Sequence, residues 1–242
     1  MRLQNKTALI TGGASGFGAG IARKFATEGA AVVVADINEG AAKSVAAEIG
    51  GTAVSLDVAD ADSWAALHEN HGTHDIVVNN AGITHLPAPM ETIEEAEFDR
   101  VFAVNAKSVY FAARTFNADM KDRGSGSILN IASTAGLSPR PNLNWYNASK
   151  GWMITATKTM AVELAPFGIR VNALCPVAGE TPLLASFMGE DTPKIRAKFL
   201  STIPLGRFST PEDLANAACY LCSDEASMIT GVAMEVDGGR CI

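Results

Sequence analysis

The stretch TGGASGFG, residues 11–18, links an apolar segment typical of a β-strand, TALIT (7–11), to an amphipathic segment typical of a helix (16–29). Its glycines Gly12, Gly16 and Gly18 would let the backbone turn tightly and let a phosphate group approach the start of the helix. Backbone N–H groups and the positive dipole end favour phosphate oxygens at such a position. Glycine turns are common, so this stretch predicts a nucleotide site only in combination with motifs further along the chain.

The rest of the chain alternates between strand and helix patterns. Further apolar runs predict strands at 31–36, 52–58, 75–82, 127–133, 169–176 and 231–239. Helical patterns lie at 39–49, 60–71, 92–123, 145–166 and 211–223, the last with a capping residue at Thr210. This alternation predicts an α/β fold, a Rossmann-like doubly wound sheet of seven parallel strands with helices on both faces, in a single domain spanning residues 1–242.

Residues 177–209 interrupt this alternation, because they contain prolines and no clear strand. A loop of that length inside a compact domain is usually a lid or a binding loop. We therefore expect a substrate-binding lid at 177–209, with one or two short helices. Its apolar beginning favours a medium-sized substrate with hydrophobic parts, although the same side chains could pack the lid onto the body: Leu183, Leu184, Phe187 and Met188.

The composition argues against several classes of protein. The chain has 19 Lys and Arg against 26 Asp and Glu, a net charge of −7, which disfavours nucleic-acid and anionic-membrane partners. No apolar run approaches the roughly 20 residues of a membrane-spanning helix, and the N-terminus lacks a signal-peptide pattern. Cys219 and Cys222 have the spacing of half a metal site, but no second pair accompanies them, so we expect no metal. A cytoplasmic location is the expectation.

Asp36 ends the second predicted strand, 18 positions after Gly18. A carboxylate at that place can bind the adenosine ribose hydroxyls of a dinucleotide, and it would repel a 2′-phosphate. The residues that usually neutralise such a phosphate are missing, since Ser15 precedes the second glycine and Ile37 follows Asp36. The sequence therefore predicts NAD rather than NADP, with capping of the next helix as the alternative role for Asp36.

Tyr146 and Lys150 are four positions apart at the start of a predicted helix, so they share one helix face. A free tyrosine has a pKa near 10, too high for an efficient proton shuttle at neutral pH. A cation about 5 Å away, at an effective dielectric constant of about 20, would lower that pKa by roughly 2 units. Ser133, at the end of a neighbouring strand, could orient a substrate oxygen, because ligands bind at the carboxyl ends of parallel strands. Taken alone, Tyr146 and Lys150 could equally be an ordinary surface pair.

These motifs occur in an order that strongly resembles the short-chain dehydrogenase/reductase family, over nearly all 242 residues. The glycine turn matches the family pattern TGxxxGxG, and NNAG (79–82) matches its fourth-strand motif. Ser133 with Tyr146-Asn147-Ala148-Ser149-Lys150 matches the Ser-Tyr-x-x-x-Lys active site. VFAVNAKSVYF (101–111) matches the helix that carries a fourth catalytic residue, Asn105.

The resemblance implies a role for each catalytic position. Tyr146 would exchange a proton with the substrate oxygen, and Ser133 would hydrogen-bond that oxygen. Lys150 would bind the nicotinamide ribose and lower the tyrosine pKa, and Asn105 would hold a water of a proton relay. The predicted cofactor-binding residues are Gly12, Ser15, Gly16, Phe17, Gly18, Asp36, Ile37, Asp57, Val58, Asn80, Ala81, Gly82, Tyr146, Lys150, Pro176, Gly179 and Thr181.

One segment departs from the family pattern. After the sixth strand the family usually has Pro-Gly-x-Ile-x-Thr, whereas this chain reads PVAGET, residues 176–181. Pro176 and Thr181 match, but Val177 replaces the glycine, and Gly179 stands where isoleucine is usual. We expect Thr181 to bind the nicotinamide carboxamide, although the shifted glycine allows a different local backbone.

Several polar residues beyond these motifs are expected to be peripheral. His68, His71 and His74 flank a helix end and are expected to face solvent, while His85 could line the pocket mouth. Arg140 could attract an anionic group or be solvated, and we favour solvation.

The leading functional prediction is an NAD-dependent alcohol dehydrogenase or carbonyl reductase, acting on a small-molecule secondary alcohol or ketone. The alternatives are a 3-oxoacyl-thioester reductase of lipid synthesis and a non-catalytic dinucleotide sensor or scaffold. The resemblance also implies a homotetramer.

Overall fold

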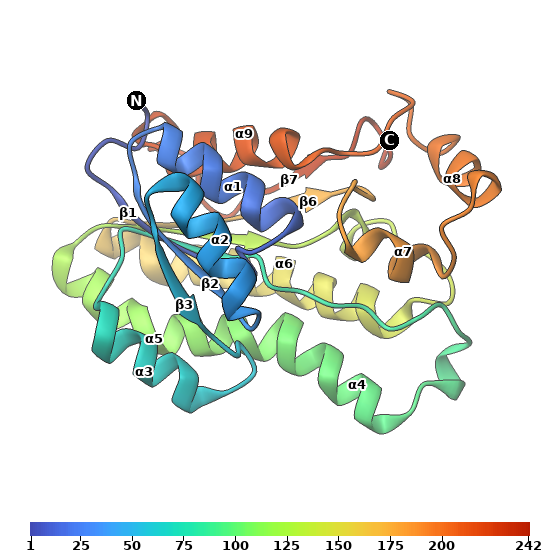
Figure 1. The fold of residues 1–242 in the computed structure, drawn as a ribbon, viewed down its shortest axis with the longest axis horizontal. Helices are drawn as coiled ribbons and strands as arrows, with labels where there is room; N and C mark the ends of the chain where they lie inside the picture. The colour runs from blue at the N-terminus through green and yellow to red at the C-terminus, as the bar shows by residue number, and fades with distance from the viewer.

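Seven apolar segments of the computed structural model form one parallel sheet, in the order β3-β2-β1-β4-β5-β6-β7 (Figure 1). The structure describes all 242 residues. The predicted doubly wound sheet is confirmed, because the order reverses between β1 and β4. The strands are β1 (Thr7–Thr11), β2 (Ala31–Asp36), β3 (Thr52–Ser55), β4 (Ile76–Asn79), β5 (Gly126–Ile131), β6 (Ile169–Pro176) and β7 (Ala233–Val236).

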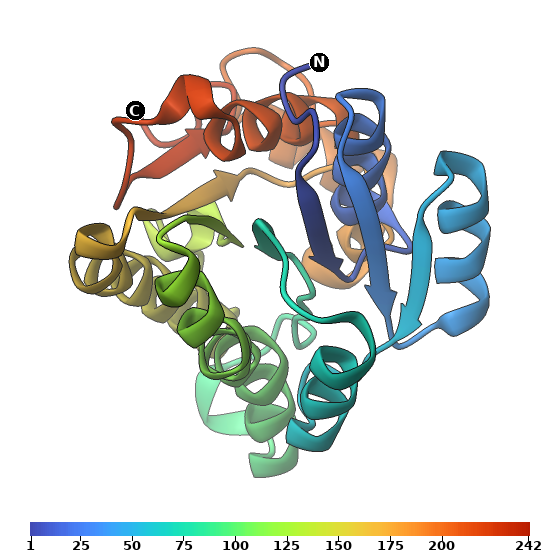
Figure 2. The same ribbon diagram turned by 90° about the vertical axis from the view of Figure 1, so that its left-hand side faces the viewer.

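Helices cover both faces of this sheet, as Figure 2 shows. On one face α1 (Gly16–Thr27), α2 (Glu39–Ile49) and α9 (Pro211–Cys222) share an apolar core with the strands. On the other face lie α3 (Ala61–His71), α5 (Ser108–Arg123) and α6 (Asn144–Leu164), whose core includes Trp64 and Phe116. Strands covered on both faces explain the continuous apolar runs of the sequence. Each helix is either too short or too polar to cross a lipid bilayer.

Some strands end earlier than the sequence predicts. Strand β3 stops at Ser55 instead of residue 58, and β4 stops at Asn79 instead of residue 82. The last backbone pairs of these strands are Asp36 with Ser55 and Asn79 with Asn130. The residues after them have left the sheet, so they are free to line a cavity at its edge.

The predicted helix 92–123 is not continuous. It consists of a short 3₁₀ turn at Met90–Thr92, helix α4 (Glu95–Phe102), a π-helical turn at Ala103–Lys107 and then α5. The π turn contains the predicted catalytic residue Asn105. Such turns are rare and are frequent at functional sites, and the sequence periodicity does not reveal them.

The segment 177–209 contains two short helices, α7 (Leu183–Met188) and α8 (Pro193–Leu200), as predicted. A small apolar cluster holds this segment together: Val177, Leu184, Met188, Ile203 and Phe208. Leu184 packs in this cluster and also lines a cavity, so the role of the segment in binding a substrate stays a prediction.

Candidate active site

A cavity of about 820 Å³ lies along the carboxyl ends of the strands. This is the edge at which ligands bind in doubly wound sheets, and the volume is typical of a cofactor site. Most of the predicted cofactor residues line it: Gly12, Ser15, Gly16, Phe17, Asp36, Ile37, Asp57, Val58, Asn80, Ala81, Gly82, Tyr146, Lys150 and Thr181. The structure thus brings together residues that are up to 169 positions apart in the chain, Gly12 and Thr181.

The glycine turn forms one end of the cavity, at the N-terminus of α1. Gly12 and Gly16 have φ angles of 61° and 51°, which other residues rarely adopt. Asn80 stabilises the turn, since its Nδ2 donates to the carbonyls of Thr11 and Gly12 at 2.9 Å each. Gly18 is buried behind the turn, where a Cβ atom would lie 2.1 Å from the Gly12 carbonyl oxygen. Gly18 therefore shapes the site without lining it.

Asp36 lies beside the glycine turn and keeps its carboxylate at the cavity wall. Its two oxygens accept hydrogen bonds from the backbone N–H groups of Ala14 (3.1 Å) and Asn38 (2.9 Å). No Lys or Arg lies within ion-pair distance of it, and the neighbouring Ile37 is 73% exposed. An unpaired carboxylate here can accept hydrogen bonds from ribose hydroxyls and would repel a phosphate.

Tyr146 and Lys150 lie on the same face of α6, as predicted, and both line the cavity. They are 5% and 4% exposed. The Lys150 ammonium lies 6.0 Å from the centre of the Tyr146 ring and donates a hydrogen bond to the Ile131 carbonyl at 2.8 Å. The pair is therefore no ordinary surface pair.

The predicted lowering of the Tyr146 pKa is wrong for this structure. Burial raises the pKa of Tyr146, because the phenolate loses its hydration, and the neighbouring Ser133 hydroxyl opposes this only in part. Burial also lowers the pKa of Lys150 to about 8. Helical spacing predicts the attraction between the two groups, but the cost of removing both from water depends on the surrounding fold.

A small open space of about 50 Å³ adjoins the main cavity and is also lined by Tyr146. Ser133, Pro176 and Gly179 line it together with the lid residue Phe187. The Phe187 ring stands edge-on to the Tyr146 ring, with 5.7 Å between the ring centres. Ser133 and Tyr146 thus meet where the sequence predicts, in a space that is also lined by α7.

Asn105 is fully buried and does not line either cavity. Its Oδ1 accepts from the Ile83 N–H, and its Nδ2 donates to the Ile83 carbonyl and to Ser149 Oγ, all at 2.9–3.0 Å. The side chain therefore fixes the segment after β4, which includes the cavity residues Gly82 and Ile83. Its role in holding a water stays a prediction.

The unusual PVAGET segment has a steric explanation. A Cβ atom at position 179 would lie 2.2 Å from the Phe17 ring, so glycine is needed there for Phe17 to pack against the strand end. Gly179 also forms a backbone bridge with Ser209. Two residues later, Thr181 lies against the glycine turn, where a Cβ on Gly16 would be 3.1 Å from the Thr181 Cβ.

Sequence reasoning missed several residues of the large cavity. They are Leu56, Ala59, Arg100, Ala103, Val104 and Ile131, whereas Pro182, Leu183 and Ser186 belong to the predicted substrate-binding segment. Most directly follow or end a strand, or belong to the π turn. The positions of the strand ends would have indicated the residues that end or follow a strand. The π turn has no sequence signal, so Ala103 and Val104 could not be predicted.

Two expectations about polar residues are wrong. His74 is 3% exposed and packs against Phe116, with both ring nitrogens unpartnered, so it does not face solvent. Its neighbours are the core side chains between α3 and α5. Arg140 is not freely solvated either, because its guanidinium lies 4.1 Å from the centre of the Phe199 ring of α8. His85 is buried and is not among the residues that line the cavities.

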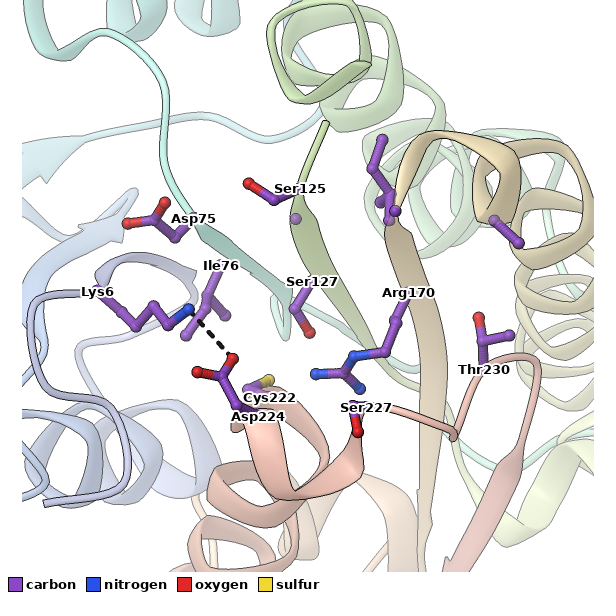
Figure 3. A pocket seen from close by; sticks show the side chains of 14 residues that line it. Lys6, Asp75, Ile76, Ser125, Ser127, Arg170, Cys222, Asp224, Ser227 and Thr230 are labelled. Carbon is purple, nitrogen blue, oxygen red and sulfur yellow. Dashed lines mark ion pairs between the residues drawn. The ribbon is translucent and has the colours of Figure 1, made fainter. Parts of the chain in front are cut away.

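A third cavity, of about 330 Å³, lies at the opposite edge of the sheet (Figure 3). Its walls include residues that precede or begin strands, such as Lys6, Ile76 and Ser127. Its charges are already satisfied, since Lys6 pairs with Asp224 at 3.1 Å and Arg170 donates to the carbonyls of Leu221, Ser223 and Ile229. None of the predicted site residues lies there.

Comparison with known proteins agrees with this geometry. A protein-family model described as Enoyl-(Acyl carrier protein) reductase matches residues 12–240. The chain is 49% identical to the 4-formylbenzenesulfonate dehydrogenase of Comamonas testosteroni, covering 100% of both chains. It is 40% identical to the 2,5-dichloro-2,5-cyclohexadiene-1,4-diol dehydrogenase of Sphingobium indicum, covering 98% of this chain and 97% of the relative.

A similar solved structure is that of a 3-ketoacyl-(acyl-carrier-protein) reductase from Brucella melitensis complexed with NADH. It is 49% identical, with a TM-score of 0.91, and the match covers 99% of this chain and 100% of that one. The site geometry, the family model and relatives that match from end to end agree, and the chain is therefore an oxidoreductase of the short-chain dehydrogenase/reductase family.

Proposed function

We propose that this enzyme is an NAD-dependent dehydrogenase or carbonyl reductase that interconverts an alcohol and a carbonyl compound, with Tyr146, Ser133, Lys150 and Asn105 as its catalytic group. The observation that carries the proposal is the convergence of Tyr146, Lys150 and the glycine turn on one cavity. The names of the two dehydrogenase relatives support this class of reaction.

The cavity fits a nicotinamide dinucleotide. Its glycine turn offers backbone N–H groups and a helix N-terminus to a pyrophosphate, and Gly12 and Gly16 keep that surface free of side chains. Asp36 would hold the adenosine ribose and favours NAD over NADP, because a 2′-phosphate would meet its unpaired charge. Asp57 and Val58 would lie at the adenine, and Lys150 at the second ribose. When bound, the nicotinamide ring supplies a carbon that can donate or accept a hydride.

The protein's own groups would handle the proton. The raised pKa of Tyr146 keeps its phenol protonated at neutral pH, the state needed to donate a proton to a carbonyl oxygen. Ser133, in the same small cavity, would hold that oxygen by a hydrogen bond. In the reverse direction, the phenolate form of Tyr146 would accept the proton of the alcohol hydroxyl, and the oxidised nicotinamide would supply the acceptor for the hydride.

Replacing Tyr146 tests this assignment. Tyr146→Phe removes the hydroxyl and keeps the ring that packs against Phe187, so NADH binding should change by less than about threefold while turnover falls at least 100-fold, the usual scale of general acid–base catalysis. Oxidation of NADH at 340 nm with a panel of ketones and aldehydes, together with NADH fluorescence titration, measures both effects. Turnover retained by Tyr146→Phe would move the proton donor elsewhere.

A second candidate is reduction of a 3-oxoacyl thioester, favoured by the similar Brucella melitensis structure and by the description of the family model. The acidic balance of this chain, with a net charge of −7, disfavours docking of an acidic carrier protein. The same 340 nm assay with a 3-oxoacyl thioester distinguishes the two, since a thioester specificity constant above that of every free ketone would favour the second candidate.

We also propose a cytoplasmic homotetramer whose chain forms one domain. Apolar side chains on α6 and nearby turns remain exposed, among them Trp152 (42%), Val162 (77%) and Phe167 (42%), and burial between subunits would remove them from water. Sedimentation velocity of the purified protein measures the subunit number, and a monomer at micromolar concentration would contradict this.

A further inference from the structure

Arg140 and Arg240 are two partly buried arginines near α8 that have neither a carboxylate partner nor a full set of carbonyl acceptors. Arg2, Arg23, Arg100, Arg123, Arg196 and Arg207 form ion pairs. Arg170 is satisfied by three carbonyls, and Arg114 is exposed. Arg140 and Arg240 are partly buried, and no carboxylate oxygen lies within ion-pair distance of either.

Arg140 lies in the loop between Ser133 and Tyr146 and reaches over the lid helix α8. Its guanidinium stacks on the Phe199 ring and donates to Thr202 Oγ1 at 3.4 Å. Burial and the charge of Arg240 lower the pKa of Arg140 to about 10, so the group is destabilised but remains charged at neutral pH. The charge of Arg240 therefore acts on Arg140, and a hydrogen bond of Arg240 to the same loop places it there.

Arg240 reaches the same place from the chain's C-terminal segment, which lies near α7 and α8 in Figure 1. Its Nη1 donates to Ser138 Oγ at 3.5 Å, two residues before Arg140, and its Nε is buried with no hydrogen-bond partner. Asp237 forms no ion pair with it, and that carboxylate accepts hydrogen bonds from the N–H groups of Gly239 and Cys241. A buried guanidinium nitrogen without a partner, beside a second cation, favours the binding of an anion.

A row of aromatic rings connects this pair of arginines to the catalytic phenol. The ring centres of Tyr146 and Phe187 are 5.7 Å apart, those of Phe187 and Phe199 are 5.9 Å apart, and the Arg140 guanidinium lies over the Phe199 ring. Phe187 therefore stands between the proton donor and the ring that carries the Arg140 guanidinium.

The Phe187 ring occupies the place beside the reacting groups that a substrate ring would need. The space that it leaves beside Ser133 and Tyr146 is about 50 Å³, whereas a cavity that binds benzene measures about 150 Å³. A substrate ring that takes the place of the Phe187 ring would have one end at the Tyr146 hydroxyl and the other directed toward Phe199 and Arg140.

We propose that Arg140 and Arg240 form a subsite for an anionic group, a carboxylate or a sulfonate, carried by the substrate at the end remote from the reacting carbon. The subsite rests on the proposed function, because it takes Tyr146 as the reacting end. Guanidinium groups suit such anions, since their planar N–H donors match two oxygens at once. The preferred substrate is then a ring or chain with a carbonyl or alcohol at one end and an anion at the other.

The test compares two aldehydes of nearly the same shape, para-carboxybenzaldehyde and its neutral methyl ester, with NADH-loaded enzyme. Wild type should prefer the anionic aldehyde in kcat/KM by about 10- to 100-fold, the scale of charge-assisted hydrogen bonds. In Arg140→Gln/Arg240→Gln this ratio should fall to about 1, with kcat/KM for the ester within about threefold of wild type. Lys198→Gln is the matched control, since it removes an exposed cation from α8 and should leave the ratio unchanged.

Binding without turnover gives an independent measurement. Titration calorimetry of para-(hydroxymethyl)benzoate into the NADH-loaded enzyme forms a complex in which both partners are reduced, so no reaction takes place. The double variant should bind this anion at least 10-fold more weakly than wild type, and Arg140→Lys should lie between them. Two results would overturn the subsite: equal kcat/KM of wild type for the anionic aldehyde and its ester, or equal affinity of wild type and double variant for para-(hydroxymethyl)benzoate.

Two further outcomes are distinguishable. If neither aldehyde is turned over but the double variant still loses binding of the benzoate, the proposed reaction fails and the anion subsite stands. If the double variant dissociates into smaller oligomers in sedimentation velocity while its benzoate affinity is unchanged, the arginines pair with an acidic residue of a neighbouring subunit, and the subsite is refuted.

Discussion

Burial raises the pKa of Tyr146 and lowers the pKa of Lys150, and together these two shifts set the chemistry of the site. The pKa of the phenol rises and that of the ammonium falls to about 8, because each charged form loses water that the protein does not fully replace. Lys150 compensates by donating to the Ile131 carbonyl. At the residue scale, the phenol is therefore prepared to donate a proton, with Ser133 as its neighbour in the small cavity.

Asp36 carries a prediction at the same scale. Asp36→Arg should weaken NADH binding by roughly 10- to 100-fold, since it removes charge-assisted hydrogen bonds of about 1.5–3 kcal/mol, and it should strengthen NADPH binding. Fluorescence titration with both cofactors measures the change. Asp36→Asn is the control, because it retains an oxygen for the Ala14 N–H while removing the charge that repels a phosphate. An NADH preference that survives in Asp36→Arg would refute the role assigned to Asp36.

At the scale of elements, the glycine turn joins β1 and α1 through contacts that leave no room for a side chain. Gly18 faces the Gly12 carbonyl, and Asn80 reaches from the end of β4 to bind the same carbonyl. The turn is therefore held by a neighbouring strand as well as by its own backbone. The same principle explains Gly179, which accommodates the Phe17 ring.

Gly18→Ala should therefore damage both stability and cofactor binding. Its Cβ would lie 2.1 Å from the Gly12 carbonyl oxygen, and relieving that clash should cost about 1–3 kcal/mol of unfolding free energy. Urea unfolding and NADH titration measure the two effects. Gly40→Ala is the matched control, because its Cβ would meet only the Asn38 side chain at 3.7 Å inside α2, so it should be neutral or stabilising. Equal stability of the two variants would show that the turn tolerates a side chain.

At the scale of the whole molecule, buried groups tie the global stability to pH. His74 is enclosed between α3, β4 and α5, and burial lowers its pKa from 6.5 to about 4, with His71, His68 and Arg123 adding repulsion and Asp75 opposing it. Between pH 6.5 and about 4, His74 binds a proton in the unfolded chain but not in the folded protein. His74 thus leaves stability intact above pH 6.5 and lowers it progressively as the pH falls toward 4.

His74→Leu should remove this dependence. Between pH 6.5 and 4, His74 should cost wild type up to about 3 kcal/mol of unfolding free energy. The variant should not show this part of the loss. Leucine keeps a similar volume beside Phe116 and leaves no unpartnered ring nitrogen. Urea unfolding at several pH values measures the difference, and parallel curves for the two proteins would contradict the buried neutral state of His74.

The parallel sheet, the glycine turn, the acid at the end of β2 and the pairing of Tyr146 with Lys150 were all predictable from the amino-acid sequence. These depend on local patterns: apolar runs that need covering on both faces, glycines that permit a turn, and a helix that places positions four apart on one face. The family assignment rests on the order of these patterns along the chain.

Four features emerge only in the folded chain. They are the protonation of Tyr146, the burial of His74, the π turn at Asn105 and the meeting of Arg140 with Arg240. Each depends on what surrounds a side chain, and the surroundings come from segments distant in sequence, such as Ser138 and Arg240, which are 102 positions apart. Desolvation and like-charge repulsion act through space, so the order of residues along the chain cannot reveal them.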